Sequence, residues 1–231
     1  MKLGETGRVG RVTDGDTFTL EDGLRVRLSA IAAPGRGEAF SAEAKAGLRA
    51  LVGERRVRLS YGGDTRDRYG RALAQVHTLG PDGTPDLWVQ AEALRLGLAR
   101  VVTWPGETVD SGALLAVEDE ARRAGRGLWA LPDYAVRSPE PNALAQDVDS
   151  LQIVEGIVLD VATVRGRTYL NFGADYRSDF TVVVAKKHAK RFAALDLASL
   201  EGARVRVRGW VELMNGPMMW ASHPARIEVL D

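Results

Sequence analysis

Residues 8–28 read RVGRVTDGDTFTLEDGLRVRL, and this stretch decides the fold of the first half of the chain. Polar and apolar residues alternate over 8–20 on both sides of the turn sequence at 13–16, which indicates two strands joined by a tight turn. A second hairpin signal at 21–23 leads into alternating residues at 24–28. The stretch therefore predicts consecutive antiparallel strands.

The segments that follow add helices and further strands. Residues 41–52 place apolar side chains at helical spacing on one face. Residues 56–61 and 71–79 alternate like strands, whereas 87–96 and 111–123 have helical spacing. This order is that of a five-stranded OB-type barrel with added helices.

The second half of the chain repeats the pattern after a change of composition. Residues 136–150 are rich in proline and polar residues, which predicts an extended linker between domains 1–135 and 151–231. The later domain shows strand-like alternation, longest at 152–164, 203–213 and 217–229, with one short helical segment at 186–195. We therefore expect a β-rich α+β fold, in which an OB-type barrel with helices is followed by a second OB-like barrel.

The composition excludes several classes of protein. The 231 residues carry 31 Lys and Arg against 31 Asp and Glu, so the formal net charge is zero. A neutral chain lacks the basic excess of proteins that coat nucleic acid, so phosphate binding is expected only at a small site built from placed arginines. The absence of cysteine excludes disulfides, thiol catalysis and cysteine-based zinc sites. No apolar run approaches the roughly 18–20 residues of a membrane span.

Four side chains carry candidate chemistry in the first domain. Asp14 and Asp16 flank a glycine; such acids commonly cap their own turn, but their oxygens also suit Ca²⁺ or Mg²⁺. Arg27 and Arg71 lie on expected strands, where arginines are usually solvated or paired with acids. If the two converge, their guanidinium groups can hold one phosphate and stabilise the charge that develops on it.

The motifs of this domain together resemble the staphylococcal nuclease (thermonuclease) family over about residues 7–130. The segments that carry the resemblance are VTDGDT at 12–17, VRL at 26–28, DRYGR at 67–71, GLARV at 97–101 and GLW at 127–129. The resemblance implies an OB-barrel enzyme that hydrolyses phosphodiester bonds of DNA and RNA with Ca²⁺, two arginines and a glutamate.

The same resemblance assigns roles to individual residues. It implies that Asp16 is a metal ligand, that Arg27 and Arg71 bind phosphate, and that Asp14 is a nearby turn acid. Tyr69 matches the tyrosine that lines the nucleotide site.

Two positions depart from the family pattern. Ala32 stands where the family has a second carboxylate ligand, and Gly35 stands where it has the glutamate that positions or deprotonates water. Ca²⁺ normally takes six to eight oxygens, so the remaining ligands are expected to bind it weakly or not at all. General-base assistance is worth about 10²–10⁴ in rate and has no side chain here. Glu38 and Glu43 are alternative bases, although a helix N-terminus explains both acids.

Basic and aromatic residues also alternate on the first expected hairpin of the second domain, around Arg167, Tyr169 and Phe172. OB folds bind oligonucleotides on their second and third strands with such residues. In the other interpretation Phe172 faces the core and Tyr169 faces solvent, because successive strand residues point to opposite faces. Tryptophan and methionine residues around 210–220 would imply a protein partner if they were exposed.

Three functions are compatible with these residues. The first is a degenerate nuclease-like protein that binds nucleic acid or nucleotide phosphate through Arg27 and Arg71, with weak or absent metal-dependent hydrolysis. The second is an active metal-dependent nuclease with a rebuilt site around Asp16 and Glu38. The third is a protein-interaction scaffold. Proteins of this nuclease-like fold are often exported, so an exported or periplasmic location is expected if the sequence is a mature form, although it shows no signal peptide.

Overall fold

The stretch 8–28 forms the predicted hairpins. In the computed structural model, which describes residues 1–104 and 109–230, β1 (Lys2–Asp14) pairs with β2 (Thr17–Leu20), and β2 pairs with β3 (Arg25–Leu28). The first strand begins earlier than residue 8, because its leading residues pair with β5 (Arg56–Tyr61). The alternation that predicted the strands also determines which of their side chains face the core. Phe18, for example, is fully buried.

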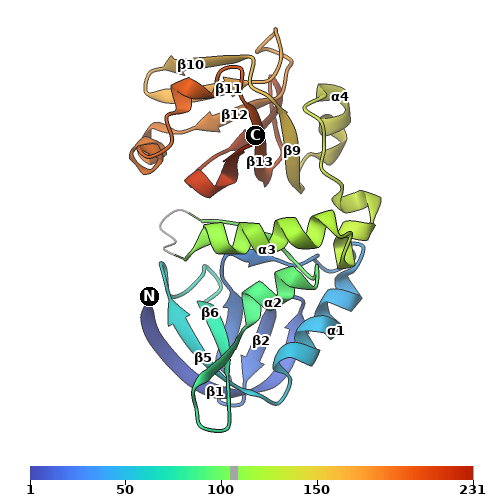
Figure 1. Cartoon of the computed structure of the whole chain (residues 1–231), viewed down its shortest axis with the longest axis vertical. Helices are drawn as coiled ribbons and strands as arrows, with labels where there is room; N and C mark the ends of the chain where they lie inside the picture. The colour runs from blue at the N-terminus through green and yellow to red at the C-terminus, as the bar shows by residue number, and fades with distance from the viewer. Residues whose placement is uncertain (105–108, 231) are drawn as a thin grey trace. The chain divides into compact units, whose positions relative to one another are not determined.

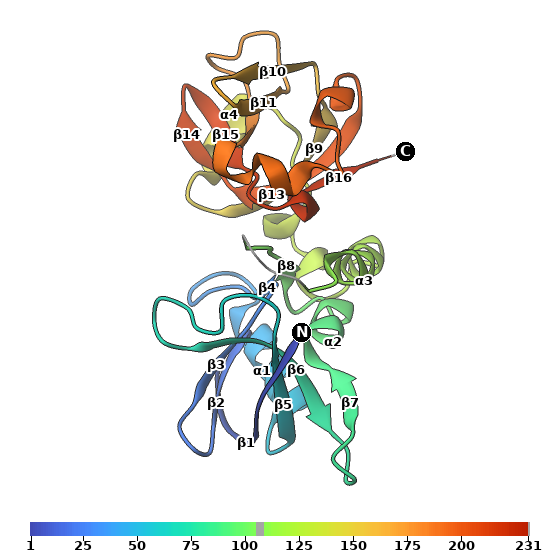
Figure 2. The same ribbon diagram turned by 90° about the vertical axis from the view of Figure 1, so that its left-hand side faces the viewer.

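The strands of the first compact unit, Met1–Tyr134, close on themselves. β5 pairs with β6 (Ala72–Leu79), which pairs in parallel with β3 and antiparallel with β7 (Pro85–Trp88). The hydrogen-bonded order β3-β2-β1-β5-β6 therefore returns to β3. Figure 2 shows these strands side by side, from β3 to β7. This strongly sheet-rich unit with helices fits an OB-like fold.

Three helices cover this unit (Figure 1). α1 (Ser41–Val52) buries one apolar stripe and contacts β1, while α2 (Val89–Arg95) contacts β6 and α3 (Ser111–Arg123). The helix expected over 87–96 starts later, because Pro85–Trp88 pairs with β6 as a strand. None of the described helices is long and apolar enough to cross a membrane.

Two glycines let the end of α2 approach the turn after α3. Gly97 and Gly127 both have positive φ, +67° and +56°, and the N–H of Leu128 donates to the carbonyl of Gly97 at 2.9 Å. A Cβ on Gly97 would lie 2.1 Å from the carbonyl oxygen of Arg126. No side chain fits between the two backbone segments at this point.

The second unit, Ala135–Asp231, contains two sheets. The smaller sheet holds, in order, β16 (Ile227–Val229), β13 (Arg204–Trp210) and β9 (Leu151–Ile157). The larger sheet holds, in order, β10 (Asp160–Val164), β11 (Arg167–Asn171), β12 (Thr181–Val184), β15 (Gly216–Trp220) and β14 (Glu212–Met214).

The predicted second OB-like barrel is not confirmed, because no hydrogen-bonded strand pair joins these two sheets in the part of the chain that the structure describes. The long strands expected at 152–164, 203–213 and 217–229 are each broken in two. The helix expected at 186–195 is a 3₁₀ helix over Lys186–Phe192. Each break moves the chain from one sheet to the other.

The stretch 136–150, expected as an extended linker, contributes to the second unit. The Glu140 carboxylate caps α4 (Pro141–Leu144), and Leu144 is fully buried in the core of this unit. Proline suits the first position of a helix because an N–H at that position would have no acceptor within the helix. In this proline-rich stretch, proline therefore begins a short helix. The boundaries between independently folding domains stay a prediction.

Candidate phosphate site

The turn between β1 and β2 buries Asp16, which is 8% exposed. Asp16 Oδ2 accepts the N–H of Ala33 at 3.0 Å, and Oδ1 accepts the hydroxyl of Thr17 at 2.9 Å. A Cβ on Gly15 would lie 2.6 Å from the Cβ of Ala33 and 2.8 Å from that of Ala44. Because residue 15 is glycine, the turn packs against both alanines and holds the Asp16 carboxylate beside residue 33.

Arg27, on β3, forms an ion pair with Asp16. Its Nη1 lies 2.6 Å from Asp16 Oδ2 and also donates to the carbonyl oxygens of Leu28 and Ile31, at 3.3 and 3.1 Å. The two charged side chains are only 18% and 11% exposed, so solvent screens their attraction less than it would at the surface. The Arg27 Nη1 is therefore engaged inside the protein.

Arg71 lies directly before β6 and is oriented by Asp67. Arg71 Nε donates to Asp67 Oδ2 at 2.6 Å, while Oδ1 accepts the N–H groups of Tyr69 and Arg71. Burial raises the pKa of Asp67, but the hydrogen bonds from the Arg71 side chain and from the two backbone groups outweigh it and hold this pKa below its ordinary value. Asp67 is therefore ionised at neutral pH and positions the guanidinium group.

Thr17 joins the two arginines. Arg71 Nη1 lies 3.5 Å from Thr17 Oγ1, which donates to Asp16, the partner of Arg27. The structure thus brings Asp16, Arg27 and Arg71 together. Thr17 and Asp67, which hold these side chains in place, were not identified from the sequence. For Asp67 the available signal was its spacing, because it is an acid four residues before Arg71.

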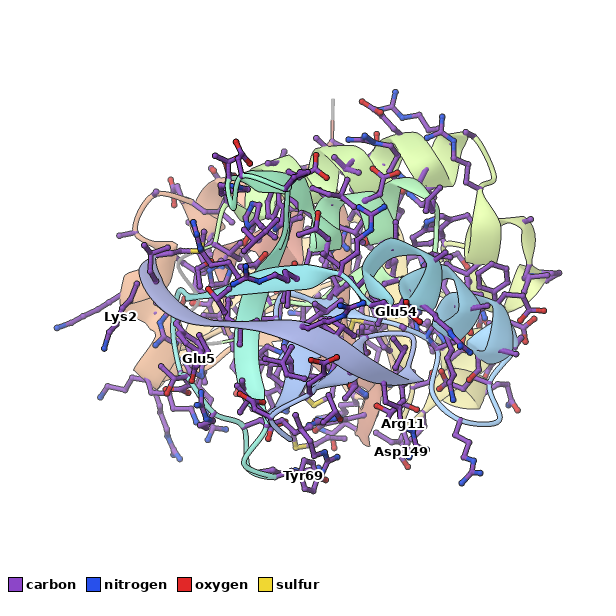
Figure 3. All side chains as sticks on the ribbon, turned by 90° about the horizontal axis from the view of Figure 1, so that it is seen from below. Lys2, Glu5, Arg11, Glu54, Tyr69 and Asp149 are labelled. Atoms are coloured by element: carbon purple, nitrogen blue, oxygen red, sulfur yellow. The ribbon has the colours of Figure 1, made fainter. Side chains whose placement is uncertain are left out.

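Tyr69 and Asp14 lie at the edge of this group. Tyr69 is 61% exposed, and its ring centroid lies 5.3 Å from the guanidinium carbon of Arg71. Figure 3 shows Tyr69 projecting outward from the loop before β6. An exposed ring beside a cation suits the stacking of a base next to its phosphate. Asp14 ends β1 opposite Thr17 in the hairpin register.

Of the positions that the resemblance assigns to Ca²⁺ ligands, residue 16 keeps a carboxylate and residue 32 does not. Ala32, in β4 (Ile31–Ala32), and Gly35 supply no side-chain oxygen. Among residues 1–104 and 109–230 there is no group of three or more His, Cys, Asp or Glu side chains that could hold a metal ion. Asp16 is present, but the Arg27 guanidinium lies 2.6 Å from its Oδ2. Since Ca²⁺ takes six to eight oxygens, these residues do not fit the ion.

Glu38 brings a carboxylate next to Gly35. Its Oε2 accepts the N–H of Gly35 at 2.6 Å, and a Cβ on Gly35 would lie 3.6 Å from the same oxygen. The hydroxyl of Tyr134 donates to the carbonyl of Ala39 at 2.6 Å, which anchors the exposed loop that carries Glu38. Glu43 lies in the first turn of α1, where its charge favours the helix dipole. Of the two alternative bases, Glu38 is the one beside Gly35.

Comparison with known proteins shows the family of this chain. The model of a family described as staphylococcal nuclease homologue matches residues 25–131, which include Arg27, Tyr69 and Arg71. A micrococcal nuclease of Shigella flexneri is 34% identical over 133 residues, which are 55% of this chain and 75% of that protein. The chain belongs to the staphylococcal nuclease family.

Further relatives of this staphylococcal nuclease homologue cover a similar share of it. An uncharacterized endonuclease of Haemophilus influenzae is 32% identical over 130 residues, 54% of this chain and 66% of that protein. Protein ParB of Escherichia coli is 35% identical over 132 residues, 54% of this chain and 73% of that protein. The family match ends at residue 131, so the second unit, Ala135–Asp231, lies outside it.

In the second unit, the residues that were predicted to bind ligand lie on opposite faces of the sheet at β11. Phe172, which directly follows β11, is 7% exposed and packs on Phe180 with ring centroids 5.0 Å apart. Its assignment to a binding surface is wrong, because strand alternation turns it into the core. Arg167 and Tyr169 line a groove on the other face.

Proposed function

We propose that this staphylococcal nuclease homologue binds nucleic acid or nucleotide phosphate at the site of Asp16, Arg27 and Arg71, and hydrolyses phosphodiester bonds weakly or not at all. Family membership supports a function that involves nucleic acid. The observation that carries the loss of hydrolysis is the ion pair of 2.6 Å between Arg27 and Asp16. This ion pair neutralises Asp16, the carboxylate that the site keeps at a position the resemblance assigns to a metal ligand. Residues 32 and 35 provide no carboxylate.

In this proposal Arg71 meets the phosphate and Tyr69 stacks on the adjacent base. Asp67 bonds to Nε of Arg71, so the terminal nitrogens of the guanidinium group, of which Nη1 also lies 3.5 Å from Thr17 Oγ1, are the donors assigned to a ligand. The Arg71 side chain is 19% exposed and the Tyr69 ring is largely exposed, so both are accessible from one side of the loop. Charge-assisted hydrogen bonds from an arginine are among the strongest contacts that a phosphate can make.

We also propose that the closed ring of β1, β2, β3, β6 and β5 is an OB-type barrel, and that the second unit is an OB-like fold opened between β13 and β15. In the first unit β3 pairs in parallel with β6, and in the second β12 pairs in parallel with β15. In both units the third strand of a meander therefore pairs in parallel with a later strand, and a helical segment and at least one further strand lie between the two in the chain, which supports a shared topology.

Arg71→Ala is expected to weaken binding of a labelled dinucleotide by about 10- to 150-fold, the loss of one or two charge-assisted hydrogen bonds. Equilibrium dialysis at low salt, with chelator present, measures it. Arg25→Ala is the matched control, since Arg25 is an exposed arginine of β3 and its removal changes the net charge equally. Equal losses of dinucleotide affinity in the two variants would contradict a specific role for Arg71.

The cleavage assay tests the other half of the proposal. Single- and double-stranded DNA and RNA would be incubated with the protein and Ca²⁺, Mg²⁺, Mn²⁺ or chelator. Metal-dependent cleavage that disappears in Asp16→Ala would overturn the hypothesis of a degenerate site, and absence of both binding and cleavage would favour a scaffold.

A rebuilt, active nuclease is the second candidate function, favoured by the position of the Glu38 carboxylate beside Gly35. If Glu38 acts as the base, Glu38→Gln lowers the cleavage rate by about 10²–10⁴ with little change in binding. Glu43→Gln is the control, because Glu43 lies at the start of α1. A rate that is equal in both variants excludes Glu38 as the base.

A further inference from the structure

One face of the larger sheet of the second unit forms a groove. Its floor comes from alternate residues of neighbouring strands, and the strand register sets Ala162, Tyr169, Val183 and Trp220 in one row across four strands. The strand residues that alternate with this row, such as Leu170, point to the opposite face of the sheet and into the core. Tyr169 and Trp220 therefore stand on either side of Val183, from strands separated by roughly 10 Å.

The groove has the size and lining of a ligand site. Its volume is about 470 Å³, within the roughly 300–1,000 Å³ of ligand pockets. Tyr176 and Met214 add two large side chains to its rim that are 61% and 54% exposed. Tyr169 and Trp220 are half-buried in the groove and Tyr176 is exposed. Aromatic rings that line a groove on a sheet offer planar surfaces on which flat ligands stack.

A hydrogen-bonded polar row crosses the same floor. Asn171 Nδ2 donates to Asp160 at 2.9 Å, and Thr181 Oγ1 donates to Asn171 Oδ1 at 3.2 Å. A carboxylate and an amide beside aromatic rings suit the amino and ring-nitrogen groups at the edge of a nucleobase.

A basic groove continues from the aromatic one. It shares Arg167 and Trp220 with the first groove, and Lys186, Lys187 and His188 also line it. Lys186 lies over the hairpin turn, because a Cβ on Gly166 would be 3.0 Å from the Cδ of Lys186. The 3₁₀ helix that follows β12 thus places two lysines beside the end of β11.

Several other arginines of the unit, unlike these cations, are paired with acids. Arg137, Arg206 and Arg208 form ion pairs with carboxylates at 2.9, 2.6 and 2.6 Å. Within residues 109–230, by contrast, no carboxylate lies within ion-pair distance of Arg167 or Lys187. Burial and the nearby positive charges of Arg191, Lys187 and Arg226 lower the pKa of His188, as expected in a basic environment.

We propose that this surface binds single-stranded nucleic acid, with bases stacked on Tyr169 and Trp220 and with phosphates along Arg167, Lys186 and Lys187. Stacking requires exposed base faces, which a duplex keeps inside its helix, so single strands are preferred. The site is separate in sequence from that of Asp16, Arg27 and Arg71 and does not depend on the function proposed for them. DNA and RNA share the chemistry that the surface recognises.

The test is fluorescence anisotropy of labelled oligo(dT), oligo(U) and a DNA duplex with the full chain, over a range of salt, with chelator present. Tyr169→Ala is expected to weaken single-strand binding by about 5- to 150-fold, the loss of one base–aromatic stack. Trp220→Leu is a second variant of the same platform. Lys186→Ala with Lys187→Ala is expected to lower the slope of log affinity against log salt by about 0.7 for each phosphate that the two lysines neutralise in the unmodified chain.

Lys2→Ala with Lys45→Ala is the matched control, since these exposed lysines of the first unit change the net charge equally. Each variant is also made in the Arg71→Ala background, so that binding by the first unit is counted separately. Single-strand binding that persists in Arg71→Ala and falls in Tyr169→Ala supports the proposal. Absence of binding, equal affinity for the duplex, or an unchanged affinity in all three groove variants would overturn it, as would a loss of binding confined to Arg71→Ala, which would support the first site alone.

Discussion

Ala32→Asp combined with Gly35→Glu is expected to raise Ca²⁺-dependent cleavage of single-stranded DNA by about 10²–10⁴-fold over the unmodified chain, the usual contribution of a general base. The first change adds a carboxylate beside Asp16, and affinity for Ca²⁺ rises with the number of charged oxygens. The second change adds a carboxylate at the position where the family has its base. The initial rate of cleavage with Ca²⁺ or chelator measures the effect.

The structure accommodates both side chains. A Cβ on Gly35 would meet only the Glu38 carboxylate, at 3.6 Å, and Gly35 does not have a positive φ. Ala32 is half-buried and lies opposite Arg100 in the pair of β4 with β8 (Arg100–Val101), so a new carboxylate has a cation across the strand. Calorimetry with Ca²⁺ shows whether the new acid remains accessible to the metal ion.

Ala32→Asn with Gly35→Gln is the matched control, because it adds similar volume without charge. Cleavage is expected to stay at the level of the unmodified chain in this control. If the acidic double variant is folded and binds Ca²⁺ but cleaves no faster, the missing carboxylates do not explain the weak hydrolysis that we propose.

Gly97→Ala is expected to destabilise the chain by about 2–5 kcal/mol. A positive φ costs an L-residue about 1–2 kcal/mol, and overpacking of a tight contact costs about 1–3 kcal/mol more. The Cβ would lie 2.1 Å from the carbonyl oxygen of Arg126, and that oxygen is backbone, which cannot rotate away as a side chain can. The free energy of unfolding in urea measures the loss.

Gly125→Ala separates the two causes. Gly125 has a φ of +60°, close to the +67° of Gly97, but nothing lies within 4 Å of its Cβ position. Its loss is therefore expected to be only about 1–2 kcal/mol, the conformational part alone. Equal losses at both positions would contradict the role assigned to the contact between Gly97 and the segment at Arg126 and Gly127.

The hairpin strands and the first helix of the first unit were predictable because short-range patterns specify them. Alternation around two turn signals gave β1, β2 and β3, and helical spacing gave α1. The start of β1 at Lys2 and the strand at Pro85–Trp88 were not predictable in this way, since both form by pairing with distant strands. In the second unit the same limit applies to the breaks in each long strand.

The candidate site was predictable as a set of residues but not as an arrangement. The motifs identified Asp16, Arg27 and Arg71, and the family match covers the two arginines. The ion pair between Arg27 and Asp16 and the bond from Asp67 to Arg71 depend on side-chain directions, which spacing alone does not specify. Alternation likewise separated Tyr169 from Phe172, and one of the two interpretations of the sequence placed Phe172 in the core, where the structure has it.

The sequence by itself determined the family, the hairpins, the neutral net charge and the absence of acids at residues 32 and 35, because each of these is a local property of the chain. Tertiary structure alone decided that Asp16 is neutralised by Arg27, and that Lys186 and Lys187 gather beside Arg167 in a chain of zero net charge. The reason is physical: composition sums charges over the whole chain, whereas binding depends on which charges the fold pairs and which it leaves together at one surface.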